Sequence, residues 1–250
     1  RQIALIGLVA AILQTVLTYR FGASVLFSGA FTVDAIALYL KILILLSAAL
    51  TLFFVVGSGE LPDERHAEFS AQILFSSLAG CVAVSASHFV LAWLALALLL
   101  LGGSLTAALA KESAQSTEAG WKQYASGVLS LLFVGYVGVV LFSRYGTLGF
   151  YELRHAILAS PLDGETEKIL FMALFGAVSS ALFTVPFQGP VADSWQGNVT
   201  ASLGFTSYAP KVAVLGLWMR LLLSLFVKPT SQPGEWVSLG GFDWGAVVLV

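Results

Sequence analysis

Long apolar segments separated by short polar connections dominate the pattern of this chain. A membrane-spanning helix needs about 20 consecutive, mostly apolar residues. Seven segments approach this length, at residues 3–19, 35–56, 69–84, 89–109, 124–142, 169–185 and 201–227, and an eighth begins near Trp244. The pattern therefore predicts an all-α fold, a polytopic transmembrane helix bundle that forms a single domain over residues 1–250.

The connections between these segments are short or strongly polar. Residues 57–66 contain glycine, proline and four charges, and residues 111–117 form a second polar connection. The longest polar stretch, residues 144–167, contains Ser160 and Pro161, and we expect it to lie along the membrane surface. Cationic residues are divided almost evenly between the two sides, so the positive-inside rule does not orient the chain.

The composition supports a membrane setting and excludes several classes of protein. Hydrophobic residues make up 58% of the chain and charged residues only 10%, whereas an ordinary soluble domain has about 25% charged residues. A net charge of -2 offers no basic surface for nucleic acid. The single Cys81 excludes a disulfide framework, and the three histidines fall in different connections, so we expect no metal site.

Both ends of the sequence suggest a segment of a longer protein. The chain starts at Arg1 without an initiator methionine, already inside an apolar segment, and residues 244–250 read as the start of another span. We therefore expect further membrane spans beyond these 250 residues. We also expect a multi-pass integral membrane protein of a bacterial inner (plasma) membrane, with the lipid bilayer as its surroundings.

Lys211 is the most unusual residue of the pattern. It follows Pro210 near the middle of the apolar segment 201–227. A lysine at the centre of the bilayer costs about 2.5–3.5 kcal/mol on insertion scales, and the proline removes one helical hydrogen bond beside it. These features favour a proton-path role for Lys211. The alternative is a lysine that faces a polar gap between helices and takes no part in transport.

Three other ionisable residues are candidates for the same path. Lys41 lies about two turns into its span, and Asp34 precedes it by seven residues on nearly the same helix face, which permits a local pair. Lys41 can also extend toward the nearer interface, as long cationic side chains do. Arg220 lies about 13 Å from Lys211 along the helix, near an interface, where anchoring is its expected role. No carboxylate occurs in the central part of any span, which argues against an autonomous proton pump.

A possible helix break follows the sixth segment. Pro186, Gly189 and Pro190 interrupt the apolar pattern, and transporters use interrupted helices to expose backbone groups beside a buried path. A simple loop between two spans explains the same spacing. We find no phosphate-binding loop, nucleophile elbow or metalloprotease helix, so we expect no catalytic residue and no cofactor in this chain.

Four stretches of the chain resemble a known family, the antiporter-like membrane subunits of respiratory NADH:quinone oxidoreductase (complex I), and among them subunit N. They are Phe31-Thr32-Val33-Asp34 with Lys41; Glu68-Phe69 with Val84-Ser85-Ala86-Ser87-His88; Glu118-Ala119-Gly120-Trp121-Lys122-Gln123-Tyr124 with Gly127; and Val185-Pro186-Phe187-Gln188 with Asp193, Gly197, Lys211-Val212-Ala213 and Arg220. Together they cover roughly residues 31–223.

The resemblance implies a role for Lys211, but this chain lacks the charged residues that would act with it. Members of the family are thought to move protons through a buried glutamate, a lysine on a broken helix and a lysine in a "KVA" sequence. Only the last is present here, as Lys211. The glutamate position falls on Ala97, the broken-helix lysine falls near Ala181, and a family histidine is replaced by Gln188.

These matches predict a membrane-arm component of a proton-translocating NADH:quinone oxidoreductase that contains no redox centre and works beside other membrane subunits. It would take part in proton translocation or support it structurally. One alternative is a subunit of a cation/proton antiporter or membrane-bound hydrogenase, which share these motifs. Others are a scaffold that has lost pumping and an unrelated small-molecule transporter.

Overall fold

The computed structural model describes residues 2–20, 24–58, 63–109, 114–189, 195–196 and 200–225. Eight α-helices have defined bounds in these ranges: α1 (Gln2–Arg20), α2 (Ala35–Ser58), α3 (His66–Ser85), α4 (Phe89–Ala107), α5 (Ala114–Tyr145), α6 (Phe150–Ala159), α7 (Gly164–Leu182) and α9 (Thr200–Leu225). A hairpin of two short antiparallel strands, β1 (Ser24–Leu26) and β2 (Phe31–Val33), precedes α2, and the short 3-10 helix η1 (Asp63–Arg65) precedes α3.

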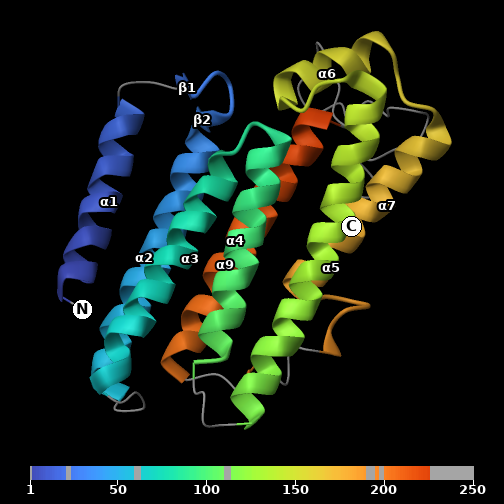
Figure 1. Cartoon of the computed structure of the whole chain (residues 1–250). Coiled ribbons are helices and arrows are strands. Elements are labelled where there is room, and N and C mark those ends of the chain that lie inside the picture. The colour runs from blue at the N-terminus through green and yellow to red at the C-terminus, as the bar shows by residue number, and fades with distance from the viewer. Residues whose placement is uncertain are drawn as a thin grey trace.

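The long helices lie side by side, and the short helix α6 crosses one end of the bundle (Figure 1). The hairpin lies at the same end as α6. Helix α9 packs most extensively against α2 and α3 and also contacts α4, α6 and α7. It therefore occupies the centre of the bundle, although it is the last helix that the structure describes. Helix α1 packs against α2 at the edge.

Four helices are long and apolar enough to cross a membrane: α2, α3, α4 and α5. Helix α1 is a shorter apolar helix over its segment Gln2–Thr18. Helix α7 starts with the charged residues Glu165, Glu167 and Lys168, and α9 contains Lys211 and Arg220, so both are less apolar. The expected total of about seven spans stays a prediction.

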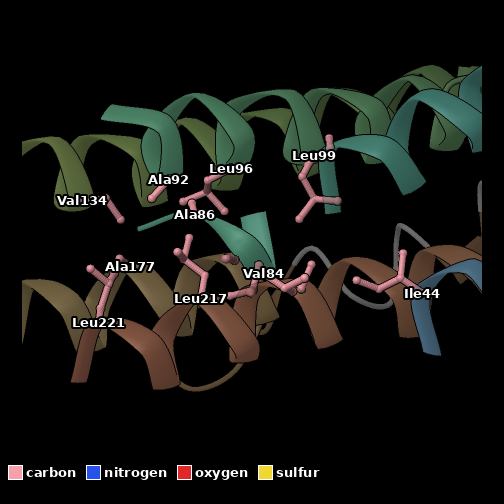
Figure 2. Close-up of a cluster of buried hydrophobic side chains, with 14 of the residues drawn as sticks. Ile44, Val84, Ala86, Ala92, Leu96, Leu99, Val134, Ala177, Leu217 and Leu221 are labelled. Atoms are coloured by element: carbon pink, nitrogen blue, oxygen red, sulfur yellow. The ribbon is translucent and has the colours of Figure 1, made fainter. Parts of the chain in front are cut away.

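Apolar side chains cover both the inside and the outside of this bundle. Figure 2 shows Leu96 of α4 opposite Leu217 of α9, and both belong with Leu99 to one continuous buried cluster. On the outer surface, in contrast, large apolar side chains are exposed, such as Phe53 at 64% and Met172 at 69%. Helices that are apolar on all sides belong in a lipid environment, because water would contact their outer faces in a soluble protein.

Small residues allow the helices to approach closely. A Cβ atom added to Gly120 of α5 would lie 2.6 Å from the Cβ of Ala108 and 3.0 Å from the backbone oxygen of Ser104. A Cβ added to Gly102 of α4 would similarly meet Ser76 of α3. Close backbone contact through small residues is how membrane helices gain packing energy where no water drives them together.

Several element boundaries differ from the sequence prediction. Helix α5 begins at Ala114, ten residues before the predicted segment, and its exposed Glu118 and Lys122 form an ion pair of 2.6 Å one turn apart. The hairpin was not predicted, because strands of three residues leave almost no pattern. Residues 150–159 form α6 within the stretch expected to lie along the membrane surface.

Candidate functional site

Lys211 lies within an unbroken α9, directly after Pro210. The helix continues through the proline, although Pro210 has no N–H to donate to the carbonyl of Thr206. The hydroxyl of Thr206 donates to the carbonyl of Ser202, 3.0 Å away, one turn earlier. The Lys211 side chain is partly buried, so the structure keeps this lysine in the body of the bundle.

The turns of α9 that follow Lys211 face residues of α4, α5 and α7. Lys211 shares one face of α9 with Val214 and Trp218, three and seven residues further along the helix. These two residues line a small cavity of about 20 Å³ together with Leu96 of α4 and Ala177 of α7. Lys211 is therefore one helical turn from the apolar centre of the bundle.

The two positions that the resemblance assigns to charged residues are close to this centre. Ala97 directly follows Leu96 and is partly buried, and Ala181 lies one turn after Ala177 and is 6% exposed. Both side chains are methyl groups, which can neither bind a proton nor pair with an ammonium group. Within the described ranges, every aspartate and glutamate lies in a connection or in the first two turns of a helix.

Serine hydroxyls join α5 to α7 beside the same centre. Ser126 donates to the backbone oxygen of Ser180, and Ser130 donates to that of Ala177, each at 2.8 Å. Both serines are buried. The sequence did not single out these residues, since serine spacing within one helix does not reveal a carbonyl acceptor on another. The two serines thus connect α5 and α7 by hydrogen bonds between uncharged groups.

The second group of candidate residues forms a cluster at the end of the bundle near α6, which we call the Arg220 cluster: Thr32, Asp34, Ser87 and Arg220. The Arg220 guanidinium donates to both carboxylate oxygens of Asp34, at 3.0 and 2.9 Å. It also donates to the Thr32 hydroxyl at 2.5 Å, and the Thr32 and Ser87 hydroxyls are 2.7 Å apart. This cluster joins α9 to the hairpin, to the start of α2 and to the turn between α3 and α4.

Asp34 has a second role in the same place. Its carboxylate accepts a hydrogen bond of 2.7 Å from the backbone N–H of Ala37, in the first turn of α2. An aspartate at this position satisfies one of the donors that a helix start leaves without a partner. Arg220 therefore holds α9 to α2 by an ion pair, whereas the sequence predicted that it anchors the helix to the membrane interface.

Lys41 does not form the local pair with Asp34 that the sequence permitted. Its ammonium lies 4.7 Å from the centre of the Phe31 ring, in a cation–π contact. Phe31 is on the hairpin strand that precedes α2, so Lys41 extends toward the nearer end of the bundle. Lys41 also lines a cavity of about 370 Å³ with Gln14 of α1 and Cys81 of α3.

The proposed helix break is only partly described. Helix α7 ends at Leu182, and Phe183 closes it in a left-handed conformation with φ of 56°, its N–H bonded to the Ser179 carbonyl. Pro186 and Gly189 follow in exposed positions, and Pro190 lies outside the described residues. A role of this break in transport stays a prediction. The described ranges contain no group of three or more His, Cys, Asp or Glu that could hold a metal ion.

Comparison with known proteins assigns the chain to a family. The profile of the family described as "NADH:quinone oxidoreductase/Mrp antiporter, TM" matches residues 86–239, which is more than half of the chain. The chain belongs to this family. The matched range contains Ala97, Ala181, Lys211 and Arg220, so the family assignment covers the centre of the bundle and α9.

Curated relatives from this NADH:quinone oxidoreductase/Mrp antiporter family are similar along almost the whole chain. A NADH-quinone oxidoreductase subunit N from Nitrosomonas europaea is 33% identical over 221 residues, 88% of this chain and 46% of the relative. Those from Coxiella burnetii and Azorhizobium caulinodans are 33% and 28% identical over 89% and 90% of the chain, and 46% and 47% of their own lengths. The chain thus spans about half the length of the curated relatives it matches.

A solved structure supports the fold. A chain of the respiratory complex I from Thermus thermophilus with bound aureothin superposes with a TM-score of 0.72, at 24% identity, over 87% of this chain and 46% of that chain. This result and the family match confirm the predicted fold class, an all-α membrane bundle of the antiporter-like type. Together with the four apolar helices, they make this a multi-pass integral membrane protein.

Proposed function

We propose that this chain forms part of a subunit N-like membrane-arm component of a proton-translocating NADH:quinone oxidoreductase. The observation that supports this most strongly is that the relatives named as subunit N match 79–99% of the chain, and not only isolated motifs. In this proposal the chain works in a bacterial inner membrane beside other membrane subunits of the complex. Electron transfer takes place in those other subunits, and this chain contains no cofactor.

Within that function, Lys211 is the residue to which we assign proton transfer. It is a lysine on the central helix α9, one turn before the residues of α9 that line the cavity at the middle of the bundle. Lys41 extends toward an end of the bundle, and Arg220 is bound to Asp34. With alanine at positions 97 and 181, the two family positions that would supply a second charge within the described residues hold only methyl groups. Transfer to and from Lys211 therefore needs water or groups outside the described residues.

The test is the exchange of Lys211 for alanine in the intact protein within its complex. Three quantities are measured in native membrane vesicles: assembly of the complex, NADH:quinone oxidoreductase activity, and proton pumping by quenching of a ΔpH-sensitive dye. Lys168→Ala is the matched control, because Lys168 is an exposed lysine at the start of α7. We expect Lys211→Ala to lower pumping to background with assembly intact, and Lys168→Ala to leave pumping unchanged.

The opposite result has a defined meaning. If Lys211→Ala vesicles assemble the complex and pump at the wild-type rate, Lys211 transfers no protons and the chain is a structural support of the membrane arm. If the wild-type protein is absent from the NADH-oxidising complex altogether, the proposed membership is wrong.

A second candidate is a subunit of an Mrp-type cation/proton antiporter, because the family description includes that class. The relatives named as subunit N favour the first proposal. Sodium-dependent proton exchange in vesicles without NADH would favour the second.

A further inference from the structure

A cavity of about 370 Å³ lies between α2, α6 and α9, directly beside the Arg220 cluster. Its volume is at the lower end of the range for small-molecule and cofactor sites, about 300–1,000 Å³. The charged residues that line it are Asp34, Arg154 and Arg220. Two positive charges and one negative charge leave the cavity with a net positive charge.

Arg154 supplies this excess charge. Arg220 is neutralised by its two hydrogen bonds to the carboxylate of Asp34. Arg154, on α6, is partly buried and forms no hydrogen bond, ion pair or ring contact within the described part of the chain. A guanidinium group with no anion beside it, in a partly enclosed cavity, is suited to bind a phosphate by two parallel hydrogen bonds.

The position of the cavity within the bundle indicates the kind of anion. Its walls come from the first turn of α2, the last two turns of α9, the surface helix α6 and the turn that contains Ser87. Figure 1 shows the end of α9 below α6, at the end of the bundle. The cavity is therefore level with the ends of the long helices α2 and α9, which is where the headgroups of a surrounding bilayer would lie.

Much of the rest of the lining is apolar and exposed on the surface of this chain. Ile36, Met219 and Leu223 line the cavity and are exposed at 46%, 47% and 37%. Tyr151, which is 76% exposed, adds a ring and a hydroxyl at the rim. Next to a phosphate bound at Arg154, the apolar side chains would form a surface along which acyl chains can lie. A soluble anion would leave these side chains uncovered.

We propose that this cavity binds the headgroup of an anionic phospholipid, with Arg154 as the ligand of the phosphate and Ile36, Met219 and Leu223 as the contact surface for an acyl chain. Basic pockets between membrane helices at this depth bind anionic headgroups. The bound lipid would cover the seam where α6 crosses α2 and α9. This function is separate from the proton transfer assigned to Lys211, because the residues of α9 that line the cavity begin about 12 Å from Lys211 along the helix.

The experiment measures lipid affinity by native mass spectrometry of the full-length protein in mild detergent. The probes are short-chain phosphatidylglycerol, which is anionic, and short-chain phosphatidylcholine, which is zwitterionic. One arginine near an anionic headgroup contributes about fivefold in affinity. We therefore expect Arg154→Gln to weaken phosphatidylglycerol binding about fivefold. It should weaken phosphatidylcholine binding less, because the choline ammonium of that lipid already offsets the charge of its phosphate.

Arg144→Gln is the matched control, because Arg144 is an exposed arginine at the end of α5 and does not line the cavity. Its phosphatidylglycerol affinity should equal that of the wild type. Inorganic phosphate is added as a competitor to distinguish a lipid from a free anion. Displacement of phosphatidylglycerol by equimolar phosphate would assign the site to a soluble anion and overturn the proposal, as would unaltered affinity in Arg154→Gln.

Leu223→Glu tests the same cavity from α9 if the arginine variant does not fold. The added carboxylate would repel the phosphate and weaken phosphatidylglycerol binding. Equal affinity of this variant and the wild type would also overturn the proposal.

Discussion

Removal of the charge on Asp34 should separate the ion pair of the Arg220 cluster from the helix cap that the same carboxylate forms. Asparagine caps a helix about as well as aspartate, so Asp34→Asn keeps the hydrogen bond to the Ala37 N–H and loses only the charge. Asp34→Ala loses both interactions. The two variants therefore differ by the contribution of the cap.

The magnitude follows from how far the pair is buried. The side chains of Arg220 and Asp34 are 15% and 39% exposed. An exposed pair contributes about 0–1 kcal/mol, and removing one partner of a fully buried pair costs about 3–5 kcal/mol. For this intermediate case we expect Asp34→Asn to lower the free energy of unfolding by about 1–2 kcal/mol. Asp34→Ala should lower it by about 1 kcal/mol more.

The assay is a double-mutant cycle of Asp34→Asn with Arg220→Gln, with the free energy of unfolding measured by circular dichroism in mixed micelles of dodecyl sulfate and a mild detergent. The coupling energy should be about 1–2 kcal/mol. The control cycle uses the exposed pair of Glu118 and Lys122, whose side chains are 61% and 38% exposed, and should give about 0.3–0.5 kcal/mol. A coupling energy between Asp34 and Arg220 no larger than that of the control would refute the reasoning.

Two further predictions concern helix packing and use the same unfolding measurement. Gly120→Ala should destabilise the protein by about 1–3 kcal/mol, because the new Cβ would lie 2.6 Å from the Cβ of Ala108. Gly7→Ala is the control and should be neutral or stabilising, because nothing lies within 4 Å of the added Cβ. Equal effects at both sites would contradict the close packing at Gly120. Ser126→Ala removes the 2.8 Å hydrogen bond to the Ser180 carbonyl and should cost about 0.6 kcal/mol, the average for such bonds between membrane helices, and a stabilised variant would contradict that contribution.

The sequence predicted the helices well because their signal is local. A span needs only a run of apolar residues, and such runs lie inside α2, α3, α4 and α5. The helix ends were harder to predict. The first turns of α5 are polar and leave no hydropathy signal, but the ion pair between Glu118 and Lys122 extends the helix there.

The Arg220 cluster could not be derived from local rules. Asp34 and Arg220 are 186 residues apart, and local spacing favoured the nearer Lys41 as the partner of Asp34. A usable signal was nevertheless present: Thr32, Asp34, Ser87 and Arg220 belong to three of the four stretches that resemble the antiporter-like family. In the structure these residues contact one another. The resemblance alone did not predict that the three stretches meet.

The central position of α9 has a consequence for the synthesis of this protein in the membrane. All of the other helices with defined bounds are made before α9, yet α9 supplies the inner surface against which α2, α3, α4 and α7 pack. Until it is inserted, the nascent bundle has an unfilled groove, and Asp34 lacks Arg220, its ion-pair partner. Incomplete chains expose surface that the finished fold buries. A chain that stalls before residue 200 would therefore remain recognisable to membrane proteases, and insertion of α9 buries the inner faces of α2, α3, α4 and α7.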